Sequence, residues 1–144
     1  MRPSPMVDSE NLDWSKLRTS LESGHEMILD QIFKCRTGGK LQKNLEQFRN
    51  LEQIVLAHLS SQSPRFYQAL EEHLRNEKSQ LKILEYLIFD LKDLKIKLLI
   101  FMDAPAATFY EFKNDLTIRV SIEKERLIPL IESIITPHKK VTCL

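Results

Sequence analysis

The sequence contains few of the residues that punctuate a β-rich fold. Only three glycines occur among the 144 residues, and there is no Asn-Gly or Asp-Gly pair, the pairs that form two-residue β-hairpin turns. Alternating apolar and polar runs are scarce, whereas apolar residues recur at spacings of three and four, as they do on one face of a helix. The sequence therefore predicts an all-α fold.

Paired cysteines and long apolar runs are also missing. Cys35 and Cys143 are the two cysteines, and they do not form the Cys-x-x-Cys spacing of many redox and metal sites. The most apolar stretch, residues 94–102, is interrupted by Lys95 and Lys97 and has about half of the ~20 residues that a membrane span needs. No signal-peptide pattern is visible. We therefore expect a cytoplasmic protein with no membrane segment.

Charge of one sign does not dominate the chain. The formal net charge is +1, so nothing favours nucleic acid or an anionic membrane as a partner. The lysines at 92, 95 and 97 alternate with Asp90 and Asp93, which is typical of a solvated helix face. Glycine-rich phosphate loops and nucleophile elbows are absent. We predict a protein that is not an enzyme and that binds another protein or a second copy of itself.

The glycines and prolines divide the chain into a tail (1–10), one domain (11–136) and a second tail (137–144). The first helix is predicted to begin between Asp8 and Asp13, either of which can cap it, and to end before Gly38. The second is predicted from about Lys40. Four helices joined by short connections predict an up-down-up-down four-helix bundle.

Two features of the later helices affect the topology. No glycine or proline occurs from Phe66 to Met102, which predicts one long helix there. The chain would then have to reverse somewhere within residues 60–72. The fourth helix carries Pro129, and an interior proline predicts a kink.

Ionisable side chains lie on the apolar faces of these predicted helices. His25, His58 and His73 fall on three different helices, and a buried imidazole must find a partner. A shared metal ion such as iron or zinc is one such partner, and a hydrogen bond within the core is the alternative. Glu77 lies one turn after His73, so the two could ligate together, although Glu77 and Glu123 could instead pair with lysine or arginine at the edge of the core.

Two segments carry a repeated pattern: LEQIVLAHLSSQSPRFYQAL at residues 51–70 and LTIRVSIEKERLIPLIE at residues 116–132. Together with Glu72-His73 and the segment around His25, they resemble the hemerythrin-like (HHE cation-binding) family of four-helix bundles over about residues 12–135. In that family a histidine is followed four residues later by a glutamate. Here His58 and Gln62 occupy these two positions in the second helix, and Arg119 and Glu123 occupy them in the fourth.

The resemblance implies two irons held between the helices by histidines and bridging carboxylates. The matching positions are His25, His58, His73 and Glu123. At the two departures, Gln62 offers a weak neutral ligand, and Arg119 cannot coordinate and would repel a second ion. This ligand set favours one iron over two, and a bundle without metal over either. In a metal-free bundle Arg119 would pair with Glu123 or with another core carboxylate.

We therefore predict a hemerythrin-like bundle with an incomplete metal site, acting as a non-enzymatic regulatory or binding module. The alternative is an iron-binding sensor of oxygen, nitric oxide or redox state that uses His25, His58, His73 and Glu123. The arginine–glutamate spacing of the last helix also resembles the regulator of sigma D family. A binding module needs an exposed apolar surface, for which the candidates are Phe66, Tyr67, Phe89, Phe109 and Tyr110.

Overall fold

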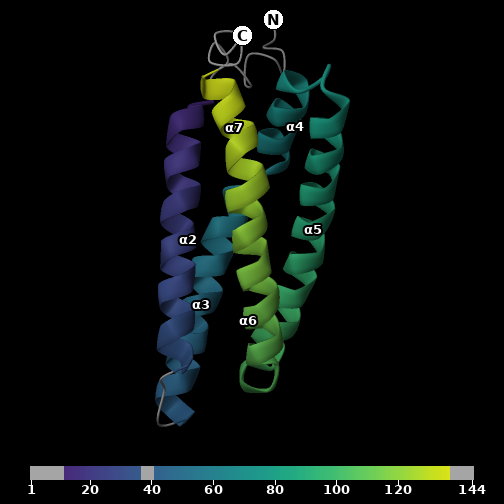
Figure 1. Cartoon of the computed structure of the whole chain (residues 1–144). Coiled ribbons are helices and arrows are strands. Elements are labelled where there is room, and N and C mark those ends of the chain that lie inside the picture. Colours follow the sequence, from purple (N-terminus) through teal and green to yellow (C-terminus); the bar gives the residue numbers. More distant parts are fainter. Residues whose placement is uncertain (1–11, 37–40, 137–144) are drawn as a thin grey trace, which may run out of the picture.

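The computed structural model describes residues 12–36 and 41–136, and every regular element in this part of the chain is helical. The predicted tails and Cys143 lie outside the described residues. The all-α prediction and the four-helix bundle are confirmed (Figure 1). The elements are α2 (Trp14–Arg36), α3 (Leu41–Ser60), α4 (Pro64–His73), α5 (Lys78–Asp103), α6 (Pro105–Ile122), the π-helical turn η1 (Glu123–Leu127) and α7 (Ile128–Ile135).

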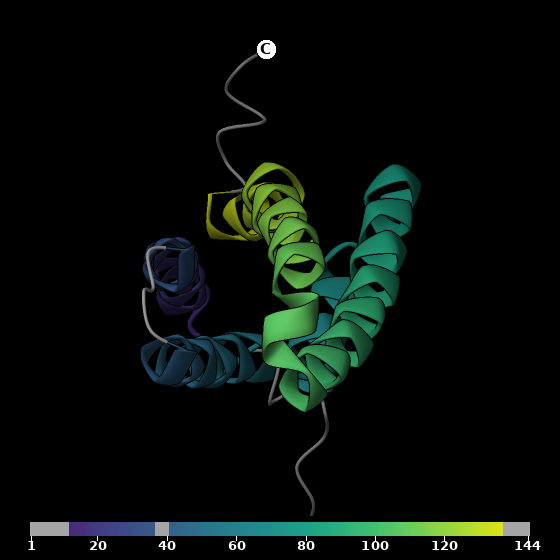
Figure 2. The same ribbon diagram turned by 90° about the horizontal axis from the view of Figure 1, so that it is seen from below.

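The helices form an antiparallel bundle with α3 beside α2 and α6 beside α5 (Figure 2). The short helix α4 continues in the direction of α3, and α5 then runs back along the bundle (Figure 1). From α6 the chain passes through η1 into α7, so these three elements make the fourth long rod. Among the described residues, no helix has the length and apolar character needed to span a membrane.

Side-chain caps explain two of the helix starts. Asp13 accepts a hydrogen bond from the backbone N–H of Lys16 at 3.0 Å, so the aspartate caps α2 as predicted. Ser63 accepts one from the N–H of Phe66 at 3.2 Å, and Pro64 follows it in the first turn of α4. The serine–proline pair thus starts α4 soon after α3 ends at Ser60, without reversing the chain.

The prediction of one helix from Phe66 to Met102 is wrong, because α4 and α5 are separate helices. Between them the N–H of Leu74 bonds the carbonyl of Leu70 at 3.0 Å, and the N–H of Glu77 bonds the carbonyl of Leu74 at 2.9 Å. Leu70 and Leu74 are both buried, so apolar burial holds this turn without glycine or proline. The chain therefore reverses after His73 and not within residues 60–72.

The fourth rod accommodates its proline with a wider turn. In η1 the N–H of Ile128 bonds the carbonyl of Glu123, five residues earlier. Pro129 has no N–H to donate, and in a regular helix its ring would crowd the carbonyl four residues before it. The π turn ends at Leu127, two positions before this proline, and carries Glu123 at its first position.

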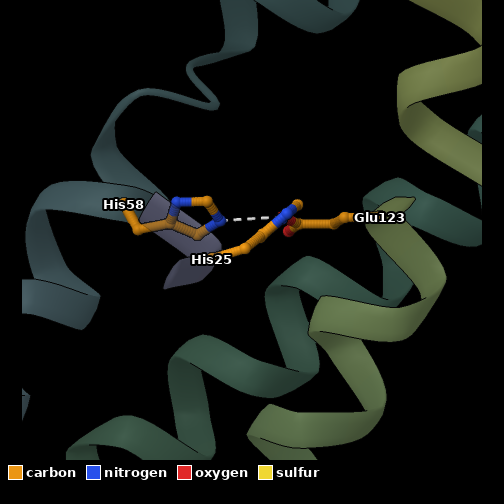
Figure 3. A group of neighbouring side chains, drawn as sticks. All are labelled: His25, His58 and Glu123. Carbon is orange, nitrogen blue, oxygen red and sulfur yellow. Dashed lines mark hydrogen bonds and ion pairs between the residues drawn. The ribbon is translucent and has the colours of Figure 1, made fainter. Parts of the chain in front are cut away.

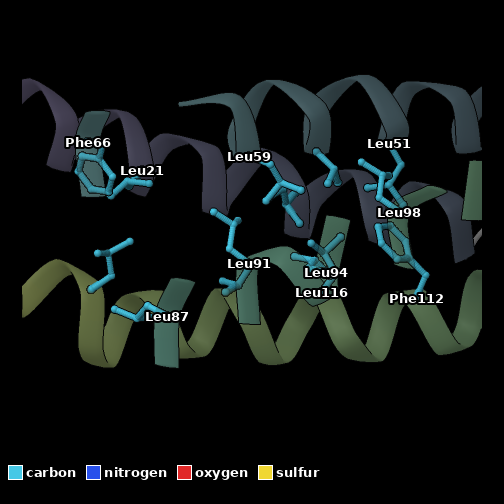
Figure 4. Packing of buried hydrophobic residues seen from close by; sticks show 14 of the residues in the cluster. Leu21, Leu51, Leu59, Phe66, Leu87, Leu91, Leu94, Leu98, Phe112 and Leu116 are labelled. Carbon is cyan, nitrogen blue, oxygen red and sulfur yellow. The ribbon is translucent and has the colours of Figure 1, made fainter. Parts of the chain in front are cut away.

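Apolar side chains from every helix fill the interior (Figure 4). Phe101 stacks on Phe112 with ring centroids 4.7 Å apart, and burial of each such side chain contributes about 1.5–3 kcal/mol. Three of the predicted partner-binding candidates belong to this core, namely Phe66, Tyr67 and Phe109. They cannot offer a surface to a partner. Phe89 and Tyr110 are 72% and 68% exposed.

Candidate metal centre

Three buried side chains from three rods meet inside the bundle: His25 of α2, His58 of α3 and Glu123 at the start of η1 (Figure 3). The Nε2 groups of both histidines lie 2.7 Å from the same oxygen, Oε1 of Glu123. The exposed fractions are 0% for His25, 7% for His58 and 0% for Glu123. The two imidazole rings pack against each other with centroids 5.1 Å apart. The prediction that ionisable side chains from different helices converge inside the bundle is therefore confirmed for these three residues.

Gly24 makes the close approach of α2 and α3 possible. A Cβ atom at this position would lie 2.9 Å from Cε1 of His58 and still closer to its Nδ1. The imidazole of His58 therefore rests directly on the backbone of α2, and only glycine leaves room for it there.

Replacing Gly24 with alanine is expected to destabilise the fold by about 1–3 kcal/mol, because the new methyl group overlaps the His58 ring. In a His58→Ala background the same change should stabilise α2 by up to about 1 kcal/mol, since alanine favours a helix over glycine. Urea unfolding of the four proteins measures both effects. A Gly24→Ala change of the same sign in both backgrounds would contradict the contact.

The second oxygen of Glu123 is held by two other side chains. Nε2 of Gln62 and Nε of Arg119 each donate to Oε2 at 2.7 Å. Gln62 is 1% exposed and lies in the turn just before the Ser63 cap. Gln62 faces inward from this turn between α3 and α4, where its amide contacts both Glu123 and Arg119.

Arg119 extends the polar cluster toward α4 and α5. Its Nη1 donates to the carbonyl of Leu87 at 2.9 Å and to Oδ2 of Asp90 at 3.1 Å. Its Nη2 donates to Oε1 of Gln62 at 2.7 Å and to the hydroxyl of Tyr67 at 3.0 Å. The Tyr67 hydroxyl in turn donates to Oε1 of Gln62 at 2.6 Å. The prediction that Arg119 pairs with a core carboxylate is confirmed.

Charge and hydrogen bonding keep Glu123 ionised. Burial alone raises the pKa of a carboxyl group, but the hydrogen bonds from His25 and His58 and the positive charge of Arg119 outweigh it, and the pKa of Glu123 lies far below its usual range. Burial also opposes the charge of Arg119. The carboxylate of Glu123 more than offsets this and raises the pKa of the guanidinium. The two side chains form a buried ion pair at 2.7 Å.

His73 and Glu77 do not join the cluster. Both are exposed. His73 ends α4 and packs edge-on against Trp14 with ring centroids 5.5 Å apart, and Glu77 takes the N-cap position of α5. The expectation that His73 converges with the other histidines is wrong, because the helix break after residue 73 places it at the end of α4. Two members of the cluster, Tyr67 and Asp90, were not predicted as site residues.

The donor set fits one metal ion. Two imidazole nitrogens and a carboxylate oxygen suit Zn(II) or Fe(II), and the three donor atoms lie within 4.8 Å of one another. Nδ1 of His25 is buried and has no hydrogen-bond partner within the described residues, so the ring is hydrogen-bonded there through Nε2 alone. A second ion does not fit, because Arg119 and Gln62 occupy the other carboxylate oxygen.

No family model, curated protein or solved structure matches this chain. The resemblance to the hemerythrin-like family therefore stays a prediction from the sequence motifs. The geometry itself shows an all-α, four-helix protein with a buried group, His25, His58 and Glu123, that could hold a metal ion.

Proposed function

We propose that the protein is a regulatory or binding module in which His25, His58 and Glu123 bind one divalent transition-metal ion, Fe(II) or Zn(II). The observation that carries the proposal is the approach of both Nε2 atoms to one carboxylate oxygen at 2.7 Å. Three protein donors leave a coordination position open to an outside ligand. Bound iron would supply at that position the affinity for oxygen or nitric oxide that a sensor needs.

The surrounding residues support a single ion. Arg119 is 1% exposed and places its positive charge beside Oε2, where it disfavours a second cation. Both imidazoles must present an unprotonated Nε2 to coordinate a metal ion, so each neutral ring would carry its proton on Nδ1. Helices α5 and α6 expose large apolar side chains, and Phe89, Leu99 and Tyr110 are each more than half exposed. Such side chains support a protein partner or a second copy for such a module.

Titration with Co(II) and Zn(II) tests the site. We expect one ion per chain, with Co(II) giving a visible absorption typical of low coordination number. His25→Ala and His58→Ala should each weaken binding by at least about 100-fold, because each removes a direct ligand. The matched control is His73→Ala, which removes an exposed histidine 5.5 Å from Trp14 and should leave the affinity unchanged.

Two results would overturn the metal site. One is a wild-type protein that takes up neither ion at micromolar concentration. The other is His25→Ala and His58→Ala proteins that bind as tightly as His73→Ala. Circular dichroism of each variant separates loss of a ligand from loss of the fold.

A further inference from the structure

A cavity of about 330 Å³ lies between α4 and α5, outside the His25–His58–Glu123 group. Its volume is within the range of about 300–1,000 Å³ that small-molecule sites occupy. Two members of the buried polar cluster contribute to its lining, and two exposed lysines line it where it meets solvent. The lining includes Gln62, Tyr67, Ile88, Leu91, Lys92 and Lys95.

The charges around this cavity are unbalanced. Lys92 and Lys95 are exposed and three residues apart, so they share one face of α5. Neither forms an ion pair within residues 12–36 and 41–136. Glu71 also lines the cavity, but its negative charge balances only one of the two lysines. The lining therefore carries an excess of positive charge. An anionic group would therefore be attracted to this opening.

The walls behind the lysines are mainly apolar. Ile88 and Leu91 come from α5, and the ring of Tyr67 comes from α4. The polar atoms at the inner end are already engaged, because the Tyr67 hydroxyl and Oε1 of Gln62 bond each other and Arg119. This end of the cavity therefore offers apolar contact more than new hydrogen bonds.

We propose that the cavity between α4 and α5 binds a monocarboxylate with an apolar body, such as a short fatty acid. The carboxylate lies between Lys92 and Lys95, and the apolar body lies against Ile88, Leu91 and the ring of Tyr67. The binding does not depend on the metal site. It does place the ligand beside Gln62, whose amide donates to Oε2 of Glu123 at 2.7 Å.

Calorimetric titration of the full chain, with EDTA present, tests this site with three probes that share one body and differ in charge: octanoate, 1-octanol and octylamine. We expect octanoate to bind about tenfold more tightly than the other two, a difference typical of a charge contact at a rim. On binding, the side-chain amide signal of Gln62 in NMR spectra should shift.

The variant Lys92→Ala/Lys95→Ala should lower octanoate affinity by about tenfold. Lys78→Ala/Lys82→Ala is its matched control, since these two exposed lysines also lie on α5 but do not line the cavity. Ile88→Trp should fill the cavity and abolish binding.

Equal affinity for the three probes, or octanoate binding unaffected by Lys92→Ala/Lys95→Ala, would overturn the proposal. Both lysine variants change exposed side chains only and should keep the fold. The two lysine variants therefore test the proposal even if Ile88→Trp fails to fold. Because EDTA is present, failure of this proposal leaves the metal proposal standing, and the reverse also holds.

Discussion

Replacing Arg119 with methionine is expected to lower the free energy of unfolding by about 3–5 kcal/mol, the usual cost of removing one partner from a buried ion pair. Methionine fills much of the same volume, so the loss comes from charge and hydrogen bonding. It leaves Glu123, which is 0% exposed, without its cation and removes the side-chain donor to the carbonyl of Leu87. Urea unfolding with EDTA present measures the loss.

Two further variants identify the cause of that loss. Lys97→Met breaks the surface ion pairs with Asp93 and Asp115, at 3.0 and 3.3 Å, and should cost about 1 kcal/mol or less. Arg119→Lys keeps the charge, but one ammonium group cannot reproduce the several directed bonds of the guanidinium, and its stability should lie between wild type and Arg119→Met. An Arg119→Met loss as small as that of Lys97→Met would contradict the role of the buried network.

Replacing Glu123 with glutamine is expected to cost about 3 kcal/mol or more at pH 7 and to abolish metal binding. The amide keeps the size of the side chain but removes the negative charge beside Arg119. His25 and His58 also lose the carboxylate oxygen that accepts from both. Because glutamine does not titrate, the variant also isolates the pH dependence that belongs to Glu123.

The sign of that pH dependence follows from the lowered pKa. The folded protein holds the pKa of Glu123 below the ordinary value of 4.5, so the carboxylate contributes its full stability above about pH 5. Below that pH the unfolded chain takes up a proton first. The contribution then falls progressively as the pH approaches the much lower folded value. The stability difference between wild type and Glu123→Gln should therefore be largest near neutrality and shrink steadily below pH 5.

Unfolding in urea at pH 7, 5, 4 and 3 checks this expectation. Glu132→Gln is the control, because Glu132 is exposed and its ion pair with Arg18 is long, at 3.6 Å, so little change is expected at any pH. The double variant Arg119→Met/Glu123→Gln should cost about 1–3 kcal/mol less than the sum of the single losses. A wild-type advantage that stays constant from pH 7 to pH 3 would show that Glu123 is not the titrating group.

The parts of the fold that were predicted correctly follow from patterns among residues close together in the sequence. The buried face of α2 follows from helical spacing through Leu21, His25 and Ile28, and all three are buried. The pairing of Arg119 with Glu123 is also local, since residues four apart share a helix face. Convergence of His25 and His58 with Glu123 could be proposed because each lies on the apolar face of its own helix.

The features that were not predicted depend on packing between residues far apart in the sequence. The turn after His73 contains no glycine or proline and is held by buried Leu70 and Leu74, so no local pattern distinguishes it from a continuing helix. Asp90 alternates with lysines, a pattern that predicts a solvated face. Its position three residues after Leu87, which is 0% exposed, was the available indication that it borders the core. Tyr67 was interpreted only as apolar, although a buried tyrosine hydroxyl usually needs a partner.

The π turn at Glu123–Leu127 determines which side of α7 faces the other helices. One additional residue in a turn advances every later side chain by about 100° around the helix axis. In this chain α6 packs mainly against α5, whereas α7 packs against α2 and α4. Deleting one residue between Glu123 and Pro129 would turn the buried Leu130 and Ile131 away from those helices while leaving Glu123 in place. The number of residues between Glu123 and Pro129 is therefore as important for the packing of α7 as the identity of those residues.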